Sequence, residues 1–315
     1  MQPISVIICS LNPRSDYLRR VLDSLQGQTL PASKWELLLV DNGSDYPLAD
    51  SWDLSWHPHP RHVRETEPGL TAARLRGIKE ATGDLLVFVD DDNLLAPDYL
   101  ATALEIRRAY PYASVFGAGA LEPEFEVEPP AERRPFCTLL GLRTAPRPLW
   151  TNNPKDSQCI PWGAGLCVSR QTAQAYVQLL SRLRIAHLLD RRGARLFCGG
   201  DDLFSWVAAR AGGGFGIFPG LRITHMVRAS RVSEPYLLRL IHDHAYSHGI
   251  LRYALCGDER PSLRTTDKIR ILLHGLRRGR FSMRAQLAAA RGADAAARDI
   301  AGREVCSLES GEFAF

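Results

Sequence analysis

The chain has 315 residues, enough to bury the core of one large domain or two small ones. Its 45% hydrophobic and 23% charged residues are typical of a globular protein, and no run approaches the roughly 18 apolar residues of a membrane span. Residues 261–304 hold ten Lys or Arg and four Asp or Glu, a charge of +6 against +4 for the whole chain. The remainder is slightly acidic and these arginines lack interleaved aromatics, so we expect no nucleic-acid partner.

The cysteines and the first residues bear on the compartment. The seven cysteines are odd in number and contain no Cys-x-x-Cys pair, so neither a disulfide framework nor a zinc site is expected. The chain enters an apolar segment at Ile4 without a basic stretch before it, and that segment is too short for a secretory signal. We therefore expect a cytoplasmic protein.

The first third of the chain alternates strand-like and helix-like patterns. After the first strand, Ser15 is the predicted N-cap of a helix whose apolar residues share one face. In chain order the predicted elements are strand 4–9, helix 15–25, strand 35–40, strand 62–65, helix 71–81, strand 85–89 and a helix from Pro97 to about Ala109. This order predicts an α/β fold with a mostly parallel central sheet flanked by helices.

The later part of the chain is less regular. Residues 121–161 are rich in proline and predict an extended, loop-rich excursion. Then follow a strand over 160–168, a helix with apolar residues from 175 to 183, a helix with apolar residues from 204 to 211, short strands at 215–218 and 221–227, and a region of helices and loops. We predict one domain over 1–230, with a donor half of about 1–120 and an acceptor half of about 121–230, and a basic helical extension over 231–315.

Three consecutive aspartates follow the most apolar strand. Leu85 to Val89 form a run typical of a strand buried on both faces, and Asp90, Asp91 and Asp92 come directly after it. Adjacent carboxylates repel one another unless a cation neutralises them, and Mg²⁺ and Mn²⁺ prefer oxygen ligands. Ligands of open α/β sheets bind at the carboxyl ends of the strands. The cluster thus predicts a metal site, with an acidic turn that caps the next helix as the alternative.

Three more segments fall where such a sheet places its ligands. Asp41 ends the second strand, Gly163 and Gly165 interrupt an apolar strand, and Asp201 and Asp202 begin a helix. Each has an ordinary structural interpretation as a turn residue, a packing glycine or an N-cap. Their joint placement at predicted strand ends and helix starts favours function.

Together these segments resemble the inverting family 2 glycosyltransferases of the GT-A fold, a nucleotide-diphospho-sugar transferase fold. The resemblance covers about residues 4–231, and Leu75 departs from it because the family usually has Asn there. The matching segments are SVIICSLN at 5–12, VDNGS at 40–44, EPGLTAARLRGI at 67–78, FVDDDN at 88–93, GAG at 163–165 and GDD at 200–202.

The resemblance implies roles for individual residues. Asp202 is the implied catalytic base, Asp92 the direct ligand of Mn²⁺ or Mg²⁺, and Asp91 a spacer. On the donor side the implied residues are Ser10, Asn12, Asp41, Arg74 and Asp90, with Asp41 on the uracil and Asp90 on the ribose or on metal-bound water. On the acceptor side they are Trp162, Gly163, Gly165 and Asp201, where Asp201 replaces the family's Glu.

The histidines are harder to assign. His225 lies in the strand-like run 223–227, where relatives often place a metal-binding histidine. The alternative is a packed or hydrogen-bonded histidine. His242, His244 and His248 are spaced i, i+2 and i+6, which does not place all three on one helical face, so we interpret them as structural or acceptor-side residues.

The expected function is metal-dependent, inverting transfer of a hexose from a nucleotide sugar, UDP-linked by resemblance, to a saccharide or lipid-linked acceptor in glycan, polysaccharide or glycoconjugate synthesis. Two alternatives stay open: a non-catalytic nucleotide-sugar-binding or partner protein of this fold, and a sugar-phosphate nucleotidyltransferase. The latter normally has a glycine-rich basic loop after the first strand, unlike residues 10–14. Residues 267–280 predict either an amphipathic helix on the inner face of a membrane or a cationic helix packed on the domain.

Overall fold

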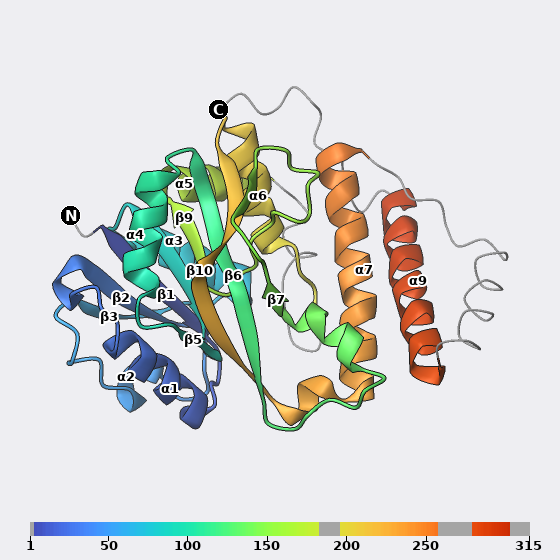
Figure 1. Ribbon diagram of the computed structural model, residues 1–315, viewed down its shortest axis with the longest axis horizontal. Helices are drawn as coiled ribbons and strands as arrows, with labels where there is room; N and C mark the ends of the chain where they lie inside the picture. The colour runs from blue at the N-terminus through green and yellow to red at the C-terminus, as the bar shows by residue number, and fades with distance from the viewer. Residues whose placement is uncertain (1–2, 183–195, 258–278, 303–315) are drawn as a thin grey trace. The chain divides into compact units, whose positions relative to one another are not determined.

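The computed structural model describes residues 3–182, 196–257 and 279–302 (Figure 1). The chain divides into two compact units that interleave along the sequence. The first comprises Met1–Glu124, Gly141–Leu179 and Asp201–Met226, and the second Phe125–Leu140, Leu180–Gly200 and Val227–Phe315. The domain boundary predicted near residue 230 stays a prediction.

Four strands of the first unit form the parallel half of its sheet. They lie in the order β3-β2-β1-β4, and every pair among these neighbours is parallel. Their side chains are almost all buried in β1, β2 and β4, because each is a continuous apolar run. The bounds are Ile4–Ser10 for β1, Trp35–Asp41 for β2, Pro60–Arg64 for β3 and Leu85–Asp90 for β4.

The other half of the sheet is antiparallel where its pairing is defined. Beyond β4 the order continues β9-β6-β10-β5, with β7 beside β6 and β8 beside β10. The predicted α/β class, with helices around a central sheet, is confirmed. The parallel pairing that was predicted for most of the sheet is found among four strands, β3, β2, β1 and β4. The bounds are Asn93–Leu95 for β5, Ala113–Phe125 for β6, Arg143–Thr144 for β7, Leu149–Thr151 for β8, Leu166–Ser169 for β9 and Gly214–Val227 for β10.

Alternate residues of the central strands face opposite layers of helices. Ile4, Val6 and Ile8 belong to one buried cluster with apolar residues of α1, α2 and α4. On the other face, Gly77 of α3 lies against Ile7, and α5 and α6 pack through Phe204. The helices are α1 (Ser15–Gln26), α2 (Leu48–Ser51), α3 (Leu70–Glu80), α4 (Tyr99–Ala109), α5 (Arg170–Arg182) and α6 (Gly200–Arg210).

Several predicted boundaries were wrong. The N-cap of α1 is Arg14 instead of Ser15, and its side chain makes no capping hydrogen bond. The strand predicted over 160–168 begins only at Leu166, and the strands predicted at 215–218 and 221–227 are one strand, β10. Pro219 and Gly220 do not end β10, because the sheet pairs continue on both sides of them.

The second unit is helical. Figure 1 shows α7 (Glu234–Cys256, orange) beside α9 (Arg280–Ala301, red), and the Tyr246 hydroxyl of α7 donates a 2.7 Å hydrogen bond to Asp299 of α9. Short 3₁₀ helices at Arg134–Leu140 and Ala229–Val232 complete it. Among the helices in the described ranges, none has the length and apolar character to cross a bilayer. Nearly all of the predicted amphipathic segment 267–280 lies outside the described residues.

Candidate active site

The three aspartates lie at the carboxyl end of β4, as predicted. Asp90 is the last residue of that strand, and Asn93 begins β5 after a two-residue turn. The Asn93 Nδ2 group donates hydrogen bonds to Asp92 Oδ1 at 2.9 Å and to Asp90 Oδ2 at 3.2 Å. Asp92 is only 3% exposed. One buried amide thus holds the two outer carboxylates of the triplet together.

His225 lies beside Asp92, although 132 positions separate them in the sequence numbering. Strand β10 pairs with β5 so that His225 is opposite Asn93, and the Met226 N–H donates to the Asp92 carbonyl at 2.9 Å. This register brings His225 Nε2 to 3.6 Å from Asp92 Oδ2. The structure therefore brings together the two residues for which metal binding was predicted.

The chemistry of this pair fits a divalent cation shared with a phosphate ligand. Mg²⁺ and Mn²⁺ are commonly bound through one or two protein carboxylates, with substrate phosphates and water as the remaining ligands. The buried Oδ1 of Asn93 accepts no hydrogen bond within the described residues and adds an oxygen donor near the pair. Across residues 3–182, 196–257 and 279–302, no group of three or more His, Cys, Asp or Glu side chains is placed to bind a metal by itself.

Asp91, the predicted spacer, accepts a hydrogen bond from the end of β1. The Ser10 hydroxyl, at the end of β1, donates a 2.5 Å hydrogen bond to Asp91 Oδ2. Cys9 is paired with Asp90 in the sheet; burial raises the pKa of its thiol to about 12, Arg74 acts against this, and the charges of Asp90 and Asp91 act with it. The thiol is consequently neutral. The hydrogen bond from Ser10 joins the end of β1 to the turn that follows β4.

Arg74 is a buried cation that faces two of the predicted site segments. Its guanidinium, carried by α3, lies 5.8 Å from the centre of the Phe88 ring and its side chain is 6% exposed. Burial alone would lower the pKa of Arg74, but the charges of Asp201 and Asp90 raise it above its ordinary value. Arg74 thus connects the acidic turn electrostatically with the start of α6.

Gly163 leaves room for this arginine. A Cβ at Gly163 would collide with Arg74 Nη2, and the Gly163 N–H donates to Asp201 Oδ2 at 2.9 Å. Two positions later, Gly165 has φ +68°, and its carbonyl accepts a 2.7 Å hydrogen bond from the Tyr99 hydroxyl. The two glycines therefore permit a close approach at one position and a left-handed backbone at the other.

Asp202 has the properties of a general base. It lies in the first turn of α6 and remains partly accessible to solvent. Burial, and after it the negative charge of Asp201, raise the pKa of Asp202 to about 7, while the Arg143 guanidinium acts in the opposite direction. A carboxylate with such a pKa accepts a proton near neutral pH far better than an ordinary aspartate.

Sequence reasoning missed Arg143. Its Cζ atom lies 3.6 Å from the centre of the Trp162 ring, and its Nη1 donates to the Ile160 carbonyl at 2.8 Å. Burial lowers the pKa of Arg143 to about 10, against the charges of Asp201 and Asp202. No sequence motif marks this arginine, because its contacts depend on the course of the chain between β7 and β9.

The predicted nucleotide end is organised around Asp41. Its Oδ1 accepts the Ser44 N–H at 2.8 Å, and its Oδ2 accepts the Leu48 N–H at 3.2 Å and Arg64 Nη1 at 2.7 Å. Burial would raise the pKa of Asp41, but these hydrogen bonds and the charge of Arg64 keep it below its ordinary value. The carboxylate is therefore ionised and fixed, and its contact with a base stays a prediction.

Asn12 joins the loop after β1 to the loop after β2. Its N–H donates to Ser44 Oγ at 2.9 Å, and its side-chain amide exchanges hydrogen bonds with Asp45 at 3.0 and 3.1 Å. Its φ of 47° places the backbone in the left-handed region, which asparagine tolerates better than most residues. The two loops that end β1 and β2 are thus held as one surface.

Comparison with known proteins finds a family that matches the first half of the chain. Residues 5–158, just under half of the chain, match the family model described as glycosyl transferase family 2. Residues 5–158 therefore resemble a family 2 glycosyltransferase domain. The resemblance predicted from the sequence motifs is thereby confirmed.

Curated relatives of the glycosyltransferase domain match over short stretches. Glycosyltransferase AglE of Haloferax volcanii is 33% identical over 92 residues, 28% of this chain and 30% of the relative. The dolichol-phosphate mannosyltransferase of Pyrococcus furiosus is 33% identical over 107 residues, 32% of this chain and 29% of the relative. The chain thus aligns with less than a third of each relative. Among solved structures, S. aureus TarS 1-349 in complex with UDP-GlcNAc is 17% identical, with 88% of this chain and 72% of that chain covered and a TM-score of 0.46.

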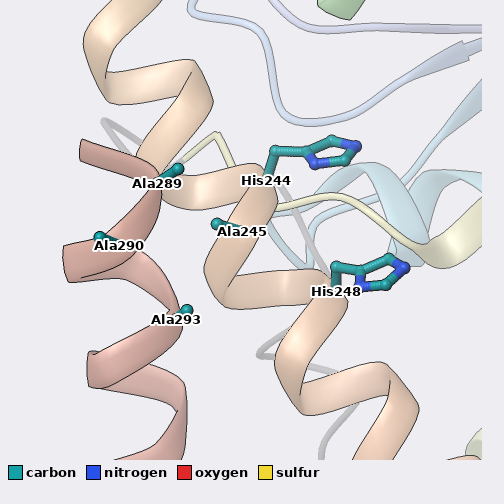
Figure 2. Close-up of a pocket in the computed structure, with 6 residues that line it drawn as sticks. All are labelled: His244, Ala245, His248, Ala289, Ala290 and Ala293. Carbon is teal, nitrogen blue, oxygen red and sulfur yellow. The ribbon is translucent and has the colours of Figure 1, made fainter. Parts of the chain in front are cut away.

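A pocket in the helical unit involves two of the histidines that the sequence left unassigned. His244 and His248 point the same way from α7, with ring centres 6.4 Å apart, and small residues of α9 line the pocket with them (Figure 2). His242 instead pairs with Asp243 at 2.8 Å. The three histidines therefore divide as their i, i+2, i+6 spacing predicted. The lining residues are His244, Ala245, His248, Ala289, Ala290 and Ala293.

Proposed function

We propose that this protein is a metal-dependent, inverting glycosyltransferase that moves a hexose from a UDP-sugar to an acceptor hydroxyl. The observation that carries the proposal is the position of Arg74, whose guanidinium lies against Gly163 next to the Asp201 carboxylate; the charges of Asp201 and Asp90 raise its pKa. A buried cation close to both groups supports the proposal that the donor chemistry and the base share one site.

On the donor side, Asp92 and His225 would hold Mn²⁺ or Mg²⁺. When bound, such an ion offsets the negative charge that develops on the departing diphosphate. Asp90 contacts the ribose or water on the ion, and the fixed carboxylate of Asp41 accepts a hydrogen bond from the uracil. Ser10 supports the acidic turn through Asp91, and Asn12 supports the nucleotide loop through Ser44.

On the acceptor side, Asp202 removes the proton of the acceptor hydroxyl. That oxygen bonds to the anomeric carbon while the bond from the carbon to the diphosphate oxygen breaks, and the diphosphate leaves with the electron pair. Because a single base acts on the side opposite the leaving group, the configuration at the anomeric carbon is inverted. Trp162 and the glycines at 163 and 165 form the wall next to this base. The acceptor is a saccharide or a lipid-linked saccharide.

A donor panel tests the proposal. Purified protein is incubated with UDP-glucose, UDP-galactose, their N-acetyl forms, UDP-glucuronate and GDP- and dTDP-sugars, with Mn²⁺, Mg²⁺ or EDTA. We expect slow, metal-dependent hydrolysis of one UDP-sugar that D92A abolishes. D98N is the matched control, because Asp98 is an aspartate whose exposed side chain pairs with the exposed Arg222 outside the acidic turn.

Two results would contradict the proposal. If no UDP-sugar binds with or without metal, the protein is not a UDP-sugar transferase. If one binds normally but is neither hydrolysed nor transferred to any acceptor tested, the chain is a nucleotide-sugar-binding protein. Product stereochemistry, read by NMR of the new anomeric proton, tests inversion separately.

A further inference from the structure

Arg143 makes two contacts with one segment of the candidate active site. It belongs to β7, which pairs with β6 through Leu121. From there its guanidinium stacks on Trp162 and donates a hydrogen bond to the Ile160 carbonyl. A planar cation on an indole face combined with a directional hydrogen bond defines both the distance and the orientation of residues 160–162.

The fixed segment leads directly to the carboxylates of α6. Gly163 follows Trp162, and its N–H donates to Asp201 Oδ2. Asp201 is in turn adjacent to Asp202 in the first turn of the helix. A displacement of Trp162 would therefore be transmitted through one backbone hydrogen bond to the position of the base.

Arg143 also supplies charge. Among the described residues, the charges that act on Asp202 come from Asp201 on the same helix and from Arg143 on β7. Arg74 of α3 acts on Asp201, and Cys159 lies near Arg143 with a thiol whose pKa is raised, first by burial and then by Asp156. That thiol is neutral, so Arg143 is the positive charge that opposes Asp201 at the base.

We propose that Arg143 is the positioning residue of the base: it fixes residues 160–163 against Asp201 and keeps the Asp202 carboxylate able to ionise in a partly desolvated site. This inference rests on the proposed role of Asp202. A merely structural stack between Arg143 and Trp162 would contribute stability without changing the ionisation of Asp202, and this difference can be measured.

The first test needs no activity. Asp202 holds its proton more tightly in the folded protein than in the unfolded chain. The free energy of unfolding of the wild type, relative to that of D202N, therefore falls as the pH rises. It levels off above the folded-state pKa, near 7. Thermal unfolding is followed from pH 5 to 9 for four proteins: the wild type, D202N, R143M and the double variant R143M/D202N. We expect the levelling-off point to move upward by about one pH unit with R143M.

The controls separate charge from stacking. R143K keeps the charge but loses the planar stack, so the levelling-off point should stay near that of the wild type. R210M is the matched control, because Arg210 also lies over a tryptophan, Trp206, but at the far end of α6, and it should change nothing. An unchanged levelling-off point with R143M overturns the proposal. If R143M does not fold, R143Q provides the same comparison.

The second test uses the reaction. In R143M, the part of the pH profile over which kcat rises (the limb) should shift to higher pH by about one unit, and kcat itself should fall. UDP-sugar binding should stay within about twofold of that of the wild type. R143K should lower kcat and leave the limb in place. A loss of kcat in R143M with no movement of the limb contradicts the charge role. If the wild type turns over no donor, the proposed function fails, whereas the unfolding test still decides whether Arg143 controls Asp202.

Discussion

The imidazole of His225 approaches the carboxylate of Asp92 to 3.6 Å, and both side chains are nearly buried. An antiparallel pair between β5 and β10 creates this proximity, and Asn93 fixes the carboxylate from the other side. Asp92 lies in the two-residue turn between β4 and β5, and His225 lies in β10, so a divalent cation held by this pair would be supported by a short turn and a strand that the sheet fixes. Rigid supports of this kind give the geometric precision that metal-assisted transfer requires.

The first prediction concerns metal dependence. We expect H225A to weaken activation by Mn²⁺ about 10–100-fold and D92A to abolish it, because each removes a ligand from a pair that has few protein ligands. The measurement is the rate of donor hydrolysis as a function of Mn²⁺ concentration. H59A is the control, since His59 lies in the loop before β3. Activity of D92A that saturates with Mn²⁺ as the wild type does would refute the assignment.

The second prediction separates the members of the acidic turn. D91A should retain more activity than D90A or D92A, yet lose stability, because the buried Ser10 hydroxyl loses its acceptor. The expected loss is about 1–2 kcal/mol in the free energy of unfolding. Urea denaturation measures it, and the double variant S10A/D91A should regain part of the loss. A stability of D91A equal to that of the wild type would show that the hydrogen bond contributes nothing.

The parallel half of the sheet could be predicted from the sequence because its strands are continuous apolar runs. Ile4 to Cys9 and Leu85 to Val89 are buried on both faces and can form little else. The same logic locates Asp90 to Asp92 and Asp202, since strand ends and helix starts follow once the elements are placed. Local pattern was therefore sufficient for the residues that follow directly on strongly patterned elements.

Contacts that depend on long-range pairing could not be predicted in this way. Pro219 and Gly220 signal a turn, yet β10 continues through them, and Gly119 of β6 has no Cβ to collide with the backbone at Pro219. Likewise Arg143 reaches Trp162 only because β7 pairs with β6. Neither fact is encoded in periodicity, because each depends on the register between distant strands.

The third prediction concerns the close approach at Gly163. G163A should reduce transfer about tenfold, because the added methyl meets the terminal Nη2 of Arg74 and forces that guanidinium to shift beside Asp201. G27A is the matched control: a Cβ at Gly27 meets only ordinary contacts, the nearest at 3.5 Å. The two variants are compared by kcat and by UDP affinity. Equal kcat for G163A and the wild type would mean that Arg74 can move aside without consequence.

The last prediction is the pH dependence of the wild type. Asp202 must be ionised to accept the proton of the acceptor, and its pKa of about 7 means that the ionised fraction rises across neutral pH. The transfer rate should therefore increase about tenfold for each unit below pH 6 and reach a plateau above pH 8. D202N should lower kcat about 100–10,000-fold and remove this limb, while UDP-sugar binding persists. The rate is measured at saturating donor and acceptor, so that the profile reports the bound complex. A D202N profile that still rises through pH 7 would assign the titration to another group, and a flat wild-type profile would show that proton removal by Asp202 does not limit the reaction.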